Sequence, residues 1–123
     1  MANRMTAVQG VFSAVAVATT TSVYSNPVKM GRSIVGAGIL AVVAGTTPDL
    51  NIFYEVSVDG VTFYQPVNTS GTTLAVVIDA LTATKWISFN PVAAPYIRIK
   101  ITGDGSNGAD VTVTASLIFQ EII

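Results

Sequence analysis

The sequence contains no cysteine and no histidine, and these two absences exclude several chemistries at once. Without thiols there is neither a disulfide framework nor a cysteine nucleophile, and without imidazole there is no Ser-His-Asp triad. Zinc sites and the common forms of haem ligation depend on the same residue types. We therefore expect neither a disulfide-bonded domain nor an active site built on histidine or thiol chemistry.

Charged side chains are scarce as well. Six basic and seven acidic residues make up 11% of the 123-residue chain and leave a formal charge of −1, whereas an average soluble domain is about 25% charged. A nearly neutral chain has no electrostatic grip on nucleic acid or on an anionic membrane, so neither is expected as a partner. A surface with so few charges tends to associate with other proteins.

The residues that are abundant favour β-strands. Val, Ile and Thr account for 44 of the 123 residues, whereas Leu occurs five times, and branching at Cβ suits a pleated sheet better than a helix. The longest apolar run, residues 34–44, has 11 residues and includes Gly36 and Gly38. It is too short for a transmembrane helix, which needs about 20 residues, and we expect a strand at residues 33–43.

The N-terminal apolar stretch is interrupted by Gln9 and Gly10, so a cleaved secretory signal is not expected there.

The clearest local pattern is a hairpin within residues 50–67. Two β-rich runs flank Asp59 and Gly60, and Asp-Gly is a favoured two-residue loop of type I′. The resulting register places Val56 opposite Phe63, with one apolar and one polar face on the pair.

Alternating apolar residues in several further segments indicate about eight short strands separated by turns. We expect one domain over residues 1–123, an all-β antiparallel sandwich of jelly-roll or Greek-key type with an extended N-terminal segment. The predicted core consists of Val56, Phe63, Trp86, Ile97, Ile99, Ile101, Val113 and Leu117.

Residues 11–18 are apolar on both faces of the predicted strand. Such a strand is buried between two layers or pressed against a partner. We expect residues 1–24 to form an arm or edge strand that engages a neighbour, and the apolar surplus of residues 8–18 and 33–44 to be buried against another chain. The predicted interface residues are Val8, Val11, Phe12, Val15, Val17 and Tyr24.

Few residues remain for catalysis. Only Glu55, Asp79 and Glu121 among the acidic residues fall on predicted strands, and the others lie in turns. General acid–base catalysis needs positioned groups with shifted pKa values, and nothing in the pattern indicates them. We predict that the protein is not an enzyme and has no cofactor.

Two binding functions stay open as alternatives. Asp104 and Asp110 lie in one glycine-rich loop with further oxygen donors, a composition that suits Ca²⁺ but is also that of an ordinary turn, which we expect here. Tyr64 and Tyr96 fall on polar strand faces, where an aromatic ring can stack on a sugar. Trp86 could serve in the same way, although a lone Trp beside apolar strands is more often core.

Several segments resemble small virion proteins of tailed bacteriophages. They are residues 57–63 (SVDGVTF), 94–102 (APYIRIKIT), the strand at 111–116 and the run at 21–27 (TSVYSNP). The likeness extends over roughly residues 19–119.

The resemblance implies a jelly-roll-like capsid decoration (cement) protein, or a related neck, tail or fibre component that recognises a host glycan. Its partners would be the major capsid protein or another virion protein, and further copies of itself, with a trimer favoured over a dimer. It would be made in the host cytoplasm and located in the virion.

Overall fold

The computed structural model describes residues 4–30 and 34–122, which form nine β-strands. The strands are β1 (Arg4–Ala16), β2 (Ser22–Tyr24), β3 (Val28–Lys29), β4 (Ile34–Ala44), β5 (Leu50–Ser57), β6 (Val76–Leu81), β7 (Lys85–Phe89), β8 (Tyr96–Gly103) and β9 (Thr112–Ile122). Within these ranges, no helix has the length and apolar character needed to cross a bilayer. The all-β prediction is confirmed, as expected from the excess of β-branched residues.

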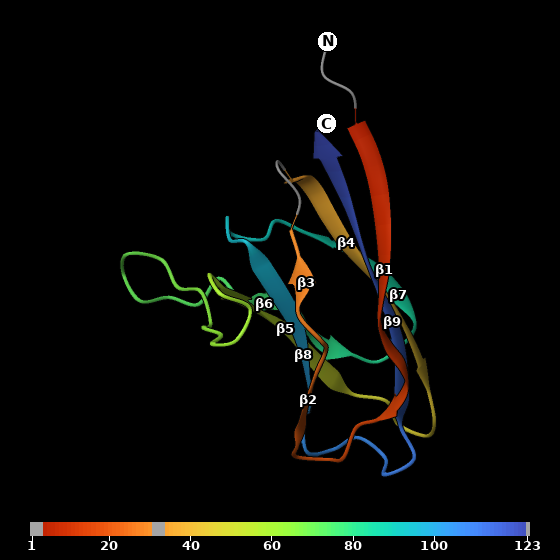
Figure 1. Ribbon diagram of the computed structural model, residues 1–123. Coiled ribbons are helices and arrows are strands. Elements are labelled where there is room, and N and C mark those ends of the chain that lie inside the picture. Colours follow the sequence, from red (N-terminus) through yellow and green to blue (C-terminus); the bar gives the residue numbers. More distant parts are fainter. Residues whose placement is uncertain (1–3, 31–33, 123) are drawn as a thin grey trace.

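The strands form two antiparallel sheets (Figure 1). The four-stranded sheet has the order β1-β9-β4-β7, and the five-stranded sheet has the order β2-β8-β5-β6, with β3 also paired to β8. One cluster of buried side chains joins them, with Ile39 and Leu117 from the first sheet and Ile52 and Ile99 from the second. Much of the apolar half of the sequence is therefore an ordinary core between two layers.

The predicted core residues of β8 and β9 are buried, because side chains alternate strictly between the two faces of each strand. Ile97, Ile99 and Ile101 are buried, while the residues between them face outward. Val113 and Leu117 of β9 are buried from the opposite sheet. Val56 is partly buried and packs against the same cluster.

The predicted Asp-Gly hairpin is wrong. Every residue of β5 pairs with β8, and β5 meets the segment that follows it through one isolated bridge, between Val56 and Tyr64 rather than Phe63. A type I′ turn needs a positive φ at both central residues, but only Gly60 has one, at 76°. The Asp59 carboxylate instead accepts backbone hydrogen bonds from Val61 and Thr62, which turns the chain into a wide loop over residues 58–75.

Two predicted core residues lie on the surface. Trp86 is 66% exposed, because its register partner in β4 is the outward-facing Leu40. Ile87 occupies the inward position instead, and side chains alternate strictly along a strand. Phe63 lies outside the core, against the guanidinium of Arg98.

The N-terminal segment is an edge strand of its own molecule. β1 pairs with β9 from Arg4 to Ala16, with register shifts around Phe12. Phe12 and Val17 are buried in their own core, which contradicts their prediction as interface residues. β4 is an interior strand between β9 and β7, and its inward-facing side chains are likewise buried in the core of the same molecule. On both β1 and β4, one apolar side packs in the core and the other faces outward.

Candidate interaction surfaces

The outer face of the four-stranded sheet carries no charged residue over most of its area. We call this surface the neutral face. It consists of Thr6, Val8, Gly10, Gly38, Leu40, Val42, Trp86, Ser88, Thr114, Ser116, Ile118 and Gln120, which share the outward side in the register of the sheet. The side chain of Arg4, at the start of β1, lies outside the part of the chain that the structure describes. Antiparallel sheets that face water normally carry polar and charged residues on that side, so the lack of charge among these residues is unusual.

Trp86 is the largest side chain on the neutral face. A Cβ at Gly38 would lie 3.1 Å from Trp86 Nε1, so the glycine makes room for the indole to lie across the neighbouring strand. Val8 is as exposed as Trp86, at 66%, and Val42 is exposed as well. The result is an uncharged surface on which apolar side chains are mixed with hydroxyl groups.

The outer face of the five-stranded sheet is different, because it carries charged residues, two of which form an ion pair. The guanidinium carbon of Arg98 lies 4.4 Å from the ring centres of both Tyr24 and Phe63. Arg98 Nε also donates to Glu55 Oε1 at 2.7 Å. Lys100 lies 5.9 Å from the ring of Tyr24. This face carries a cation–π and ion-pair cluster, and Glu55 is part of it.

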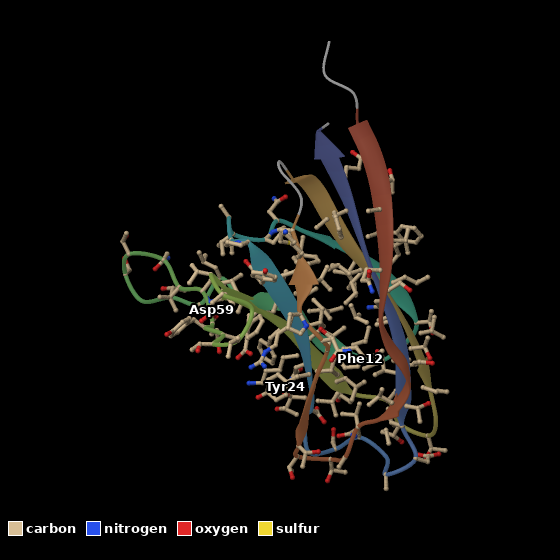
Figure 2. The ribbon with its side chains drawn as sticks, in the orientation of Figure 1. Phe12, Tyr24 and Asp59 are labelled. Atoms are coloured by element: carbon tan, nitrogen blue, oxygen red, sulfur yellow. The ribbon has the colours of Figure 1, made fainter. Side chains whose placement is uncertain are left out.

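The 58–75 loop is ordered at its base by Asp59 (Figure 2). Its Oδ1 accepts hydrogen bonds from Val61 N at 2.9 Å, Thr62 N at 3.0 Å and Ser57 Oγ at 2.9 Å. These bonds, with the backbone N–H of Thr62 first, lower the pKa of Asp59 to about 2. Asp59, the one charged residue of the loop, therefore stabilises the shape of the loop through these hydrogen bonds.

The far half of the loop is ordered by Asn68. Its Oδ1 accepts from Ser70 N at 2.9 Å and from Thr72 N at 3.0 Å. Gln65 Nε2 donates to Thr73 Oγ1 at 2.8 Å and ties the two limbs together. Such local side-chain bonds stabilise a non-repetitive backbone without a hydrophobic core of its own.

This ordered loop carries a second apolar surface. Val58 and Val61 are 80% and 81% exposed, the highest values among the large apolar residues described. Tyr64, Val67 and Leu74 are also exposed. The loop, yellow-green to green in Figure 1, projects beyond β5 and β6, away from the four-stranded sheet.

The acidic residues of the alternative Ca²⁺ site accept hydrogen bonds from different partners. Asp110 accepts from the hydroxyl of Thr46 at 2.8 Å and from its N–H, which lowers the pKa of Asp110. Asp104 accepts from Ser106 N and Oγ, both at 2.8 Å, and these bonds lower the pKa of Asp104. The side-chain hydrogen bond to Asp104 raises the pKa of Asp49. Among the described residues, no group of three acidic ligands gathers.

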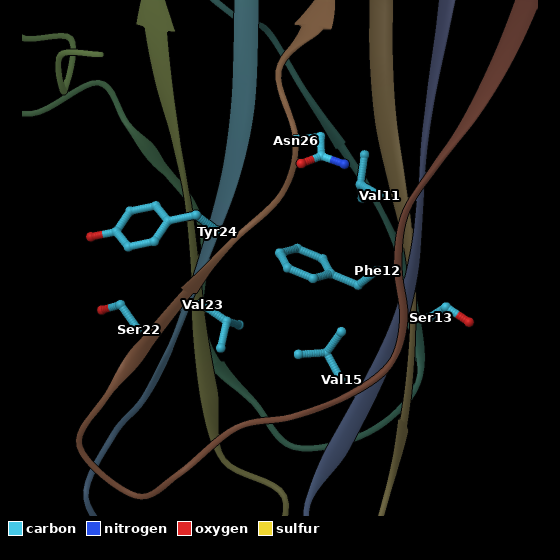
Figure 3. Close-up of a pocket in the computed structure, with 8 residues that line it drawn as sticks. All are labelled: Val11, Phe12, Ser13, Val15, Ser22, Val23, Tyr24 and Asn26. Atoms are coloured by element: carbon cyan, nitrogen blue, oxygen red, sulfur yellow. The ribbon is translucent and has the colours of Figure 1, made fainter. Parts of the chain in front are cut away.

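The predicted interface residues of β1 mostly line a gap in their own molecule. A cavity of about 540 Å³ opens between β1 and β2, and Val11, Phe12, Val15 and Tyr24 are among its lining residues. Figure 3 shows the side chains of Phe12 and Val15 pointing from β1 toward β2. Only Val8 of the predicted set lies on the neutral face.

Of the remaining acidic residues on strands, the side chains of Asp79 and Glu121 lie outside the part of the chain that the structure describes. Tyr96 is half-buried and packs beside Gly60. The exposed apolar residues of the loop were missed, because residues 58–67 were expected to form a hairpin. The pattern of Asp59 and Asn68, each followed two residues later by an N–H that its side chain accepts, is the signal that indicates a loop.

Neither a model of a known protein family nor a curated protein sequence matches this chain.

Proposed function

We propose that this protein is a structural virion protein, a capsid decoration (cement) protein that stabilises the head of a tailed bacteriophage through subunit contacts. The observation that carries the proposal is the neutral face, an outward sheet surface with Val8, Val42 and Trp86 exposed on it. Burying such a surface gains about 25 cal/mol per Å² of apolar area, and no charge has to be desolvated there. The partner is the major capsid protein or another virion protein, joined by further copies of this chain, with a trimer favoured over a dimer.

The strand order supports a jelly-roll topology for this proposal. β2 and β3 both pair with β8, so they count as one interrupted strand, and eight strands remain. The four-stranded sheet then has the order first, eighth, third, sixth, and the other has second, seventh, fourth, fifth. A jelly roll distributes its eight strands in this order. Jelly rolls serve in viral capsids and in lectins alike, so the topology alone does not assign a function.

The test is binding of the purified protein to undecorated phage heads, measured by co-sedimentation. Val42→Asp places a charge on the neutral face, and we expect it to lower binding at least tenfold. Val76→Asp is the matched control, because Val76 has nearly the same exposure, 43% against 44%, but lies on the edge of the other sheet. Equal binding of wild type and Val42→Asp would overturn the proposal. Deletion of residues 1–18 would not be a suitable test of the N-terminal segment as an interface, since it also removes Phe12 and Val17 from the core.

A tail, neck or fibre module that recognises a host glycan is the second candidate. Its support is the exposed indole of Trp86, which lies across Gly38 as a flat platform with Ser88 nearby in β7. Binding on a glycan array that is lost in Trp86→Ala or in Tyr64→Ala would favour this function. Head binding by the wild-type protein that is weakened in Trp86→Ala, together with an empty array, would favour decoration.

A further inference from the structure

We propose that the 58–75 loop of one copy docks on the neutral face of a second copy, so that the protein associates head to tail. This inference deepens the proposed structural role and rests on it for its purpose. It names the first partner of the neutral face as another copy of this chain.

The distribution of exposed apolar residues is the first argument. Nearly all the large apolar side chains exposed in the described residues fall in two places. Val8, Val42 and Trp86 lie on the neutral face, and Val58, Val61, Tyr64, Val67 and Leu74 lie in the loop. Contiguous exposed apolar surface marks interaction sites, and here a single chain carries two of them with different shapes.

The two surfaces cannot meet within one molecule. Phe63 holds the loop against Arg98, whose side chain lies on the outer side of the five-stranded sheet. The neutral face is the outer side of the other sheet, and the core lies between them. Each surface therefore needs a second molecule, and two different surfaces in contact make a heterologous interface. Such an interface closes into a ring or continues as a filament.

The electrostatics of the two surfaces match. The only charged residue of the loop is Asp59, and its Oδ1 accepts hydrogen bonds from Val61 and Thr62 within the loop. The neutral face has no charged member. Docking that leaves the exposed Asp59 carboxylate at the solvated rim buries apolar groups without leaving an unpaired ion in a dry interface, a change that costs several kcal/mol per ion.

The shape and order of the two surfaces favour docking as well. The loop is already held by the bonds of Asp59 and Asn68, so little conformational entropy is lost on binding. On the neutral face, a Cβ at Gly10 would meet no atom within 4 Å, so the surface is open at that point. A projecting loop and a low sheet surface are complementary in form.

The experiment uses full-length protein and measures mass by light scattering and sedimentation velocity. Val61→Asp disables the loop, Val42→Asp disables the face, and Thr20→Asp in the exposed turn after β1 is the control that only adds a charge. We expect wild type and Thr20→Asp to associate as concentration rises, and each of the other two variants to stay monomeric. Circular dichroism verifies that all variants are folded.

Mixing the two monomeric variants is the decisive step. Val61→Asp retains its face and Val42→Asp retains its loop, so together they form one intact interface and can grow no further. We expect a 1:1 heterodimer, with the fluorescence of Trp86, the single tryptophan, shifted to the blue on mixing. A mixture that stays monomeric overturns head-to-tail docking, because a self-paired interface cannot be rescued in this way. A monomeric wild type, or association that survives either variant, also overturns it.

The same proteins separate this inference from the proposed function. A monomeric wild type that binds undecorated heads overturns head-to-tail docking and leaves the decoration role standing. A head-to-tail oligomer that does not bind heads supports the docking and overturns the decoration role.

Discussion

Arg98 and Glu55 face each other across β8 and β5, and Arg98 Nε lies 2.7 Å from Glu55 Oε1 on the outer side of the five-stranded sheet. The same guanidinium contacts the rings of Tyr24 and Phe63 at 4.4 Å. One side chain thus connects β2, β5, β8 and the 58–75 loop. The ion pair and the aromatic contacts of Arg98 are therefore parts of one half-buried cluster.

The stacking of Phe63 on Arg98 predicts a measurable coupling. In a double-mutant cycle of Arg98→Ala and Phe63→Leu, the two changes in the free energy of unfolding should fail to add by about 0.5–1 kcal/mol, the size of a surface cation–π contact. Lys100→Ala is the control partner, since Lys100 lies near Tyr24 and Phe53 instead of Phe63. Chemical denaturation measures the free energy of unfolding of the single and double variants. Fully additive effects of Arg98→Ala and Phe63→Leu would contradict the coupling.

Trp86 should matter little for stability. Because its side chain is 66% exposed, Trp86→Ala should change the free energy of unfolding by less than about 1 kcal/mol, compared with about 3–5 kcal/mol for a buried Trp. Ile99→Ala, at a fully buried position, is the contrasting variant and should cost about 2–5 kcal/mol. Thermal and urea unfolding give both values. A loss above 3 kcal/mol in the free energy of unfolding of Trp86→Ala would show that Trp86 belongs to the core.

Gly103 should be intolerant of any side chain. A Cβ there would lie 2.6 Å from Asn107 Oδ1 and closer still to the carbonyl oxygen of Ala18. Gly103→Ala should therefore destabilise the fold by about 1–3 kcal/mol, as overpacking does. Gly10→Ala is the matched control, because a Cβ at Gly10 meets nothing within 4 Å, and it should be nearly neutral. Similar melting temperatures for the two variants would show that the close approach at Gly103 is absent.

The 58–75 loop should loosen in acid. Folding lowers the pKa of Asp59 from 3.8 to about 2, so the charged carboxylate is the form that the loop stabilises. Its contribution is fully present above about pH 4 and is lost as the pH falls toward 2. Hydrogen exchange at the amides of Val61 and Thr62, the groups that donate to Asp59, should show reduced protection over this range.

Asp59→Asn is the control for the acid effect, since an amide oxygen still accepts hydrogen bonds but does not titrate in this range. Protection in this variant should be independent of pH between 4 and 2. Equal acid sensitivity in the variant and the wild type would assign the effect to another carboxyl group.

Composition and alternation were enough to predict much of this structure. The excess of Val, Ile and Thr predicted an all-β chain, because branching at Cβ acts locally on each residue. The alternation of Ile97, Ile99 and Ile101 predicted their common burial, because the two-residue period of a strand assigns each side chain to a face.

What only the tertiary structure decided is which partner each strand takes and which of two apolar sides faces inward. β5 has local turn chemistry that suits a hairpin, yet it pairs along its whole length with β8, 39 or more residues away in sequence. Trp86 and Ile87 are both apolar neighbours, and the register of β7 on β4 alone places one outside and the other inside. Strand pairing depends on contacts between distant residues, which no local pattern encodes. The pairing also decided that the sparse charges gather around Arg98 on one sheet and leave the other sheet with a neutral face.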